Sequence, residues 1–126
     1  MANYKPFVSF LKLIPMGVKG GATLMLLVDT GSTYTIIEPE ALMSIGCDPA
    51  TATASRRVFT AGGPVTLPRL SIPQFHCVGQ VVEDYDALAY TLLPEVHVDE
   101  LLGMDFLKRF SIEIKPRSEE IVVRNI

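Results

Sequence analysis

An acidic residue stands directly after an apolar run in this sequence. The run Leu26–Val28 has the composition of a buried strand, and Asp29-Thr30-Gly31-Ser32 follows at once. A lone carboxylate removed from water is costly unless it is neutralised or hydrogen-bonded. One interpretation is a simple turn, because Asp, Thr, Gly and Ser are ordinary turn residues. A phosphate-binding loop is another, but a single glycine without Gly-Lys-Ser/Thr is weak support for it.

The size and composition of the chain limit what Asp29 can belong to. The 126 residues are enough for one domain with a sizeable core and too few for two ordinary ones, so we expect a single domain over residues 1–126. Apolar residues make up 48% and charged residues 20%, which is typical of a folded globular chain and not of a disordered one. A net charge of −3 and the absence of any Lys/Arg run give no indication of nucleic acid or an anionic membrane as partner.

Targeting signals and metal-ligand patterns are also missing from the sequence. The longest uncharged apolar run, Ala22–Val28, is too short to span a bilayer, and no signal-peptide pattern opens the chain. A cytoplasmic location is therefore the default expectation. Cys47 and Cys77 form no CxxC motif, which predicts two free thiols. His76 and His97 have no spaced ligand partners, so we expect no metal site and no cofactor.

The first half of the chain predicts strands on both sides of Asp29, followed by a helix. The helix is expected over Glu38–Gly46, because Pro39 suits a first helical position and Gly46 a C-terminal stop. The expected strands are Phe7–Ile14, Ala22–Val28 and Thr35–Ile37. A glycine-bearing turn, Met16–Gly21, is expected between the first two strands.

The second half predicts hairpins and one more short helix. A hairpin is expected over Arg57–Leu70, with its tip at Ala61–Pro64, and the chain closes on a hairpin of Ser111–Ile114 and Ile121–Arg124. The remaining segments are one or two strands in Ser71–Val82 interrupted at Pro73 and Gly79, a mixed stretch Leu88–Val98, and an apolar Leu101–Gly103 leading into helical turns at Met104–Arg109. The sum is a mostly-β single domain with one or two short helices.

Three of these segments, in this order, resemble the retropepsin-like (retroviral-type) aspartic protease family, and its cellular or bacterial members more than viral ones. Asp-Thr-Gly-Ser between Leu27-Val28 and Thr35–Ile37 resembles the active-site loop. Leu101–Gly103 resembles the second signature, which crosses beside that loop in a ψ-shaped strand arrangement. The segment Thr60–Pro64 stands where the family has a glycine-bearing flap. The resemblance covers about residues 5 to 125 and implies a single-lobe acid protease barrel that forms a two-fold dimer.

The chemistry implied by the resemblance needs two carboxylates, and this chain has one Asp-Thr-Gly loop. Two copies on a two-fold axis would each supply Asp29, so the implied partner is a second copy of the chain. Carboxylates roughly 3 Å apart share one proton, and the pair activates a water to hydrolyse a peptide bond. The implied function is an aspartic endopeptidase. The alternatives are a weak or inactive dimerisation or peptide-binding module of the same fold, and an unrelated small β-barrel with Asp29 in a turn.

The resemblance also implies roles for the neighbours of Asp29. Thr30 would bond across the dimer interface to the backbone of the opposite loop. Gly31 would let that backbone pass where a Cβ would intrude. Ser32 would hydrogen-bond the outer carboxylate oxygen, and capping a turn or helix is its alternative role.

Two further segments complete the implied site. Leu102 and Gly103 belong to the ψ crossing, where the glycine gives room beside the catalytic loop or simply starts a helix. The flap residues Ala61, Gly62 and Gly63 would fold over a polypeptide bound in extended form, or they form an ordinary mobile hairpin tip.

Other residues receive less specific interpretations. Val58, Val65 and Ile37 would favour hydrophobic substrate side chains beside the cut. The acidic run Glu83–Asp86 is expected to be a solvated loop, and Asp105 a charge at a helix N-terminus. The terminal segments Phe7–Ile14 and Glu119–Ile126 are candidates for dimer contacts, because the termini of retroviral relatives interleave into a shared sheet.

Overall fold

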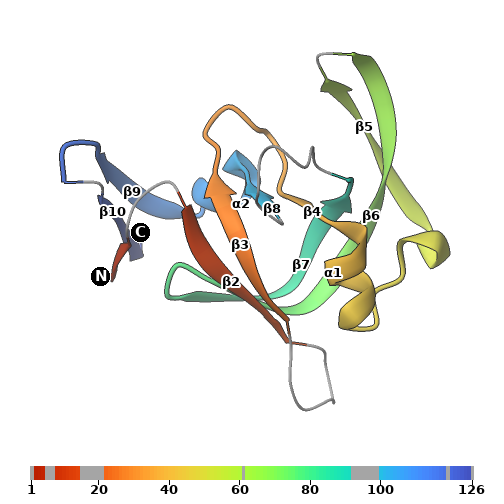
Figure 1. The fold of residues 1–126 in the computed structure, drawn as a ribbon, viewed down its shortest axis with the longest axis horizontal. Coiled ribbons are helices and arrows are strands. Elements are labelled where there is room, and N and C mark those ends of the chain that lie inside the picture. The colour runs from red at the N-terminus through yellow and green to blue at the C-terminus, as the bar shows by residue number, and fades with distance from the viewer. Residues whose placement is uncertain are drawn as a thin grey trace.

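The fold consists of one mixed sheet, one antiparallel sheet and two short helices (Figure 1). The computed structural model describes residues 2–4, 8–14, 22–60, 62–91, 100–118 and 120–125. One sheet has seven strands and the other has three, and in Figure 1 the smaller sheet lies at the opposite end of the molecule from the β5–β6 hairpin. The expectation of a mostly-β fold with one or two short helices is confirmed.

The larger sheet curls back on itself into a half-barrel. Its strand order is β2-β3-β8-β4-β7-β6-β5, and β2 also pairs with the far end of β6. The strands are β2 (Val8–Ile14), β3 (Ala22–Val28), β4 (Ile36–Ile37), β5 (Ala54–Thr60), β6 (Gly63–Cys77), β7 (Gln80–Ala89) and β8 (Glu100–Leu102).

Strand β8 brings the two signature segments together. It runs parallel to β3, with Val28 opposite Leu102, and antiparallel to β4 on its other side. The strand before Asp29 and the strand after it therefore both flank the Leu101–Gly103 segment. This arrangement fixes the Asp29 loop from two directions.

The hairpin of β5 and β6 is longer than the sequence indicated. Pro73 was expected to interrupt a strand, and this prediction is wrong, because β6 continues through it to Cys77. Proline only removes one ladder donor, and the register is the same on both sides: Ile72 faces Tyr85 and Gln74 faces Glu83. The expected break at Gly79 is confirmed. Val78 and Gly79 both have positive φ values, 45° and 77°, as a two-residue hairpin turn requires.

The helices confirm the local signals. Helix α1 (Pro39–Ser44) begins at the proline, and Gly46 follows it with φ 83° and donates its N–H to the carbonyl of Met43 at 3.0 Å. A 3₁₀ turn, η1 (Pro49–Thr51), was not predicted and is capped by Asp48, whose side chain accepts the N–H of Ala50 at 2.9 Å. Helix α2 (Met104–Leu107) is a single turn.

The core is centred on three aromatic rings from three different segments. Phe75 stacks on Tyr85 with ring centroids 4.5 Å apart, and Phe106 meets both rings edge-on at 5.3 and 5.7 Å. All three side chains are fully buried, and Leu26, Ile37, Leu42 and Leu102 pack into the same cluster. The core thus joins α2 to β6 and β7 beneath the Asp29 loop.

The two ends of the chain form the smaller sheet. Its order is β1 (Ala2–Tyr4), β10 (Glu120–Asn125), β9 (Phe110–Lys115), and N and C lie side by side in Figure 1. Strand β1 was not predicted. Residues Ile121–Val123 of β10 pair on both edges within their own chain, so this part of its backbone is not available to a second copy.

Some predictions fall on residues outside the described ranges. These are Phe7, the turn at 16–21, the flap residue Ala61, positions 92–98 of the mixed stretch, and the end residues Glu119 and Ile126 of the C-terminal segment. Leu88 and Ala89 of that stretch end β7. The prediction of a solvated loop at Glu83–Asp86 is wrong in its conformation, because these residues lie within β7. The acidic side chains of this run are exposed, while Tyr85 between them is buried.

Candidate active site

The carboxylate of Asp29 is held by its own loop at the end of β3. The Asp29 N–H donates to the carbonyl of Leu102 at 2.9 Å, which anchors the backbone to β8. The N–H of Gly31 donates to Asp29 Oδ1 at 2.9 Å, and the N–H of Ser32 donates to the Asp29 carbonyl at 3.1 Å. The residue therefore opens a turn, and its half-exposed side chain is hydrogen-bonded while remaining within reach of solvent.

Glycine at position 31 leaves room for this carboxylate. A Cβ on Gly31 would lie 3.2 Å from Asp29 Oδ1, which is tighter than ordinary van der Waals contact. Thr30 is exposed, and its hydroxyl makes no hydrogen bond to any residue in the described ranges. Its expected bond to a second copy stays a prediction.

The expected hydrogen bond from Ser32 to the Asp29 carboxylate is not formed in this structure. The Ser32 hydroxyl instead donates to the carbonyl of Tyr34 at 2.7 Å. A hydroxyl has one proton to donate, and here a nearby backbone acceptor within the same turn takes it. The alternative role, capping a turn, describes what Ser32 does.

The ψ crossing leaves no space for a side chain at position 103. A Cβ on Gly103 would be 3.0 Å from the carbonyl oxygen of Ser32 and closer still to the carbonyl of Tyr34. Directly after it, the N–H of Met104 donates to Ser32 O at 2.8 Å and that of Asp105 to Thr33 O at 3.0 Å. Gly103 therefore gives room for the crossing and also serves as the N-cap residue of α2, so both interpretations of it hold.

A buried hydroxyl that the sequence interpretation passed over connects these segments. Thr35 is fully buried, and its Oγ1 accepts hydrogen bonds from the Tyr85 hydroxyl at 2.9 Å and the Gly103 N–H at 3.1 Å. The same hydroxyl donates to Asp105 Oδ1 at 2.8 Å. Burial raises the pKa of Tyr85 well above its ordinary value. Asp105 thus lies in the first turn of α2, as predicted, and has a second role as an acceptor.

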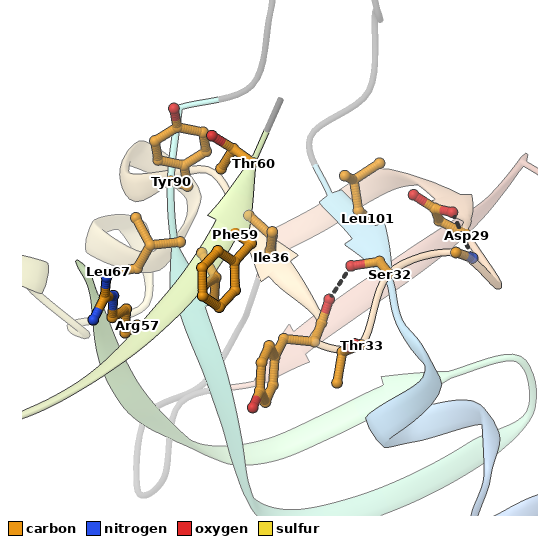
Figure 2. A pocket seen from close by; sticks show the side chains of 13 residues that line it. Asp29, Ser32, Thr33, Ile36, Arg57, Phe59, Thr60, Leu67, Tyr90 and Leu101 are labelled. Atoms are coloured by element: carbon orange, nitrogen blue, oxygen red, sulfur yellow. Dashed lines mark hydrogen bonds between the residues drawn. The ribbon is translucent and has the colours of Figure 1, made fainter. Parts of the chain in front are cut away.

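Asp29 lies at the edge of a pocket of about 680 Å³, whose lining side chains are drawn in Figure 2. The loop contributes Gly31–Tyr34, and β5 contributes Arg57–Thr60. The remaining walls are Ile36, Leu67, Tyr90 and Leu101. Most of this lining is apolar or aromatic, with an open side toward solvent.

The pocket walls differ in part from the predicted ones. Val58 lines the pocket as expected, whereas Ile37 is fully buried in the core and its neighbour Ile36 faces the pocket instead. Strand alternation explains this exchange, and it likewise puts Leu101, not Leu102, on the pocket side. Val65 is not among the lining residues.

The tip of the β5–β6 hairpin is tied by one side chain. Thr60 Oγ1 donates to the carbonyl of Gly63 at 2.8 Å and accepts the N–H of Gly62 at 3.2 Å. Thr60 lines the pocket, while the two glycines lie beyond its lining. A flap role for this tip stays a prediction.

A second acid was missed because nothing in its sequence context marks it. Glu100 opens β8 and is fully buried, on the face of the strand opposite Leu101. Burial, and secondarily the charge of Glu100, raise the pKa of the Cys77 thiol. Glu100 therefore belongs to the core side of the sheet and not to the pocket.

Within the described ranges, no three His, Cys, Asp or Glu residues are grouped as metal ligands would be. None of the helices described here has the length and apolar character needed to cross a lipid bilayer.

Comparison with known proteins agrees with this geometry. The family model described as aspartyl protease matches residues 14–106. A retropepsin-like aspartic protease from Rickettsia conorii superposes with a TM-score of 0.63 at 17% identity, covering 94% of each chain. The retroviral protease-like domain of Ddi1 from Leishmania major gives 0.61 at 14% identity, covering 98% of this chain and 91% of that domain. No curated protein sequence matches. The chain belongs to the aspartyl protease family and has the retropepsin-like fold.

Proposed function

We propose that this chain is an aspartic endopeptidase whose catalytic pair forms when two copies each contribute Asp29. The observation that carries the proposal is the placement of Asp29. Its carboxylate is hydrogen-bonded by Gly31, remains half-exposed, and borders a pocket of about 680 Å³. Thr30 and Gly31 beside it are exposed in the single chain, which leaves the loop accessible to a second copy.

The reaction follows from bringing two such carboxylates together. Like charges a few ångströms apart cannot both ionise, so the pair holds one proton. The ionised member takes a proton from the attacking water, and the protonated member donates to the carbonyl oxygen of the scissile bond. The titration would belong to the pair and not to either chain. The Gly31 N–H keeps the Asp29 side chain oriented for this exchange.

The pocket favours a peptide in extended form. Strand β5 stands at the end of the strand order of the larger sheet and lines the pocket with Arg57–Thr60, and an extended peptide can pair with such an edge strand while its alternate side chains enter the pocket. Ile36, Val58 and Leu101 would accept apolar side chains.

The proposal is tested by measuring peptide cleavage and the molecular mass of the protein in solution. We expect the purified chain to cleave members of a mixed peptide library and to have the mass of a dimer. Asp29→Asn should remove cleavage while leaving the dimer intact. Asp86→Asn is the matched control, because Asp86 is exposed on β7 outside this pocket and should keep activity.

Two results would contradict the proposal. Cleavage that survives in Asp29→Asn would assign the activity to another group or to a contaminant. A wild-type dimer that cleaves nothing in the library and binds no pepstatin-type inhibitor would favour the alternative, a dimerisation or peptide-binding module with the same fold.

A further inference from the structure

We propose that Arg57 selects peptide substrates that carry a carboxylate at one fixed position away from the scissile bond. This inference rests on the proposed function, because it names the substrate class of the same site. The shared ligand chemistry is a peptide carboxylate, whether from an Asp or Glu side chain or from the C-terminus of the peptide.

The charges lining the pocket carry the inference. Among the lining residues that the structure describes, Asp29 and Arg57 are the only charged ones. Figure 2 shows them on opposite sides of the pocket, with Phe59 and Ile36 between them in that view. A bound peptide that reaches both residues would contact the Asp29 carboxylate at one end of the pocket, apolar side chains in its middle, and the Arg57 guanidinium at its other end.

Arg57 has no acidic partner among the described residues. Its side chain is exposed, and its guanidinium lies over the ring of Phe59 with 5.7 Å from Cζ to the centroid. The described ion pair joins Arg124 and Glu113, at 3.5 Å, elsewhere in the molecule. Phe59 is itself 81% exposed, so the two side chains form an open aromatic and cationic surface above the pocket.

The preceding arginine provides an internal contrast. Arg56 lies over the ring of Tyr34 at 5.2 Å and lines a separate pocket of about 240 Å³. That pocket also contains the acids Asp84, Asp86 and Asp105. The same pocket is also lined by Arg69, Lys108 and Arg109. Arg56 therefore lies among charged groups of its own chain, whereas Arg57 lines the pocket where a substrate would lie.

The guanidinium group suits a carboxylate ligand. Its planar fork forms two parallel hydrogen bonds to a carboxylate, which a lysine or an amide cannot reproduce. Successive side chains of an extended peptide alternate in direction, so one acid at a fixed spacing from the cut would reach Arg57. Since the site is open to solvent, we expect the acid to raise kcat/KM by only about fivefold, and this effect should decrease with added salt.

The test measures cleavage of matched peptides by the dimeric protein. The peptides differ by Asp against Asn, or Glu against Gln, at each position, with free or amidated C-termini. We expect about a fivefold preference in kcat/KM for the acid at one position. Arg57→Gln should remove that preference, and Arg57→Glu should shift it to Lys or Arg. Arg56→Gln, the matched control, should keep the acid preference. If the amidated and free peptides alone differ, the carboxylate is the C-terminus.

Binding measured separately distinguishes this inference from the proposed function. The same peptides are titrated calorimetrically into Asp29→Asn, with and without Arg57→Gln, and dimer mass is recorded for each variant. If no peptide is cleaved but acid-containing peptides bind through Arg57, the proposed function fails and carboxylate recognition stands. Carboxylate recognition is overturned if wild type shows no acid preference, if Arg57→Gln keeps one, if neither cleavage nor binding occurs, or if Arg57→Gln only alters the dimer mass.

Discussion

The hydroxyl of Thr35 donates to the carboxylate of Asp105 across 2.8 Å, although 70 positions separate the two residues in the sequence. This contact ties the strand that follows the Asp29 loop to helix α2. The same oxygen also accepts the N–H of Gly103 and the hydroxyl of Tyr85. One threonine thus connects three segments beside the Asp29 loop.

Replacing Thr35 with valine keeps the shape of the side chain and removes its hydroxyl. The N–H of Gly103 and the hydroxyl of Tyr85 would then lose a buried acceptor, and each unsatisfied buried group costs about 1 to 3 kcal/mol. We expect Thr35→Val to lower the free energy of unfolding in urea by about 3 kcal/mol. Thr33→Val is the control at an exposed position. Equal, small losses in both variants would show that the network contributes little.

Gly103→Ala tests the ψ crossing directly. The added Cβ would lie within 3.0 Å of the Ser32 carbonyl oxygen and nearer to the backbone of Tyr34, where no flexible side chain can move aside. We expect a loss of about 3 kcal/mol or more in unfolding free energy, or failure to fold. At Gly62 the nearest atom to an added Cβ is Thr60 Oγ1 at 3.8 Å, so Gly62→Ala should change stability by less than about 0.5 kcal/mol. Comparable stability of the two variants would contradict the crowded crossing.

The parts of the site that sequence reasoning found are those encoded by local signals. The motif at Asp29 and the proline that begins α1 each act within a few residues of themselves, whereas Gly103 packs against Ser32 and Tyr34, which are distant in the sequence. Their positions in the structure agree with the sequence interpretation. Local rules are sufficient to locate the helix start at Pro39, whereas Asp29 and Gly103 are identified by their resemblance to the family's two signatures.

The parts that sequence reasoning missed depend on which strands become neighbours. Thr35 is an ordinary strand former in sequence, and only the β4–β8 pairing brings it to Gly103. Glu100 is buried by the same central position of β8. Strand β1 has three residues and is recognisable only once β10 lies beside it. The strand break predicted at Pro73 is wrong, because a long, curled strand tolerates one missing backbone N–H donor.

The Tyr85 phenol should make the fold sensitive to alkaline pH. Burial raises its pKa in the folded chain, so the folded state retains the proton that the unfolded state releases near pH 10. Stability is therefore complete below about pH 10 and decreases as the pH rises above it. Urea unfolding between pH 8 and 11 should show a shallower alkaline decrease in Tyr85→Phe than in wild type. Tyr90→Phe, at an exposed position, should behave like wild type, and an unchanged slope in Tyr85→Phe would refute this origin.

The two free cysteines should differ in reactivity by their burial. The thiolate is the reactive form, and burial together with the charge of Glu100 raises the pKa of Cys77 well above normal. Cys47 is half-buried, and burial raises its pKa to a lesser degree. An excess of a thiol reagent at neutral pH should modify Cys47 in the native protein and reach Cys77 only through unfolding. In Cys47→Ser, labelling of Cys77 followed by mass spectrometry should therefore accelerate in urea in step with unfolding. Rapid native labelling of Cys77 would contradict this protection and would mean that the sheet opens locally between β6 and its neighbours β2 and β7.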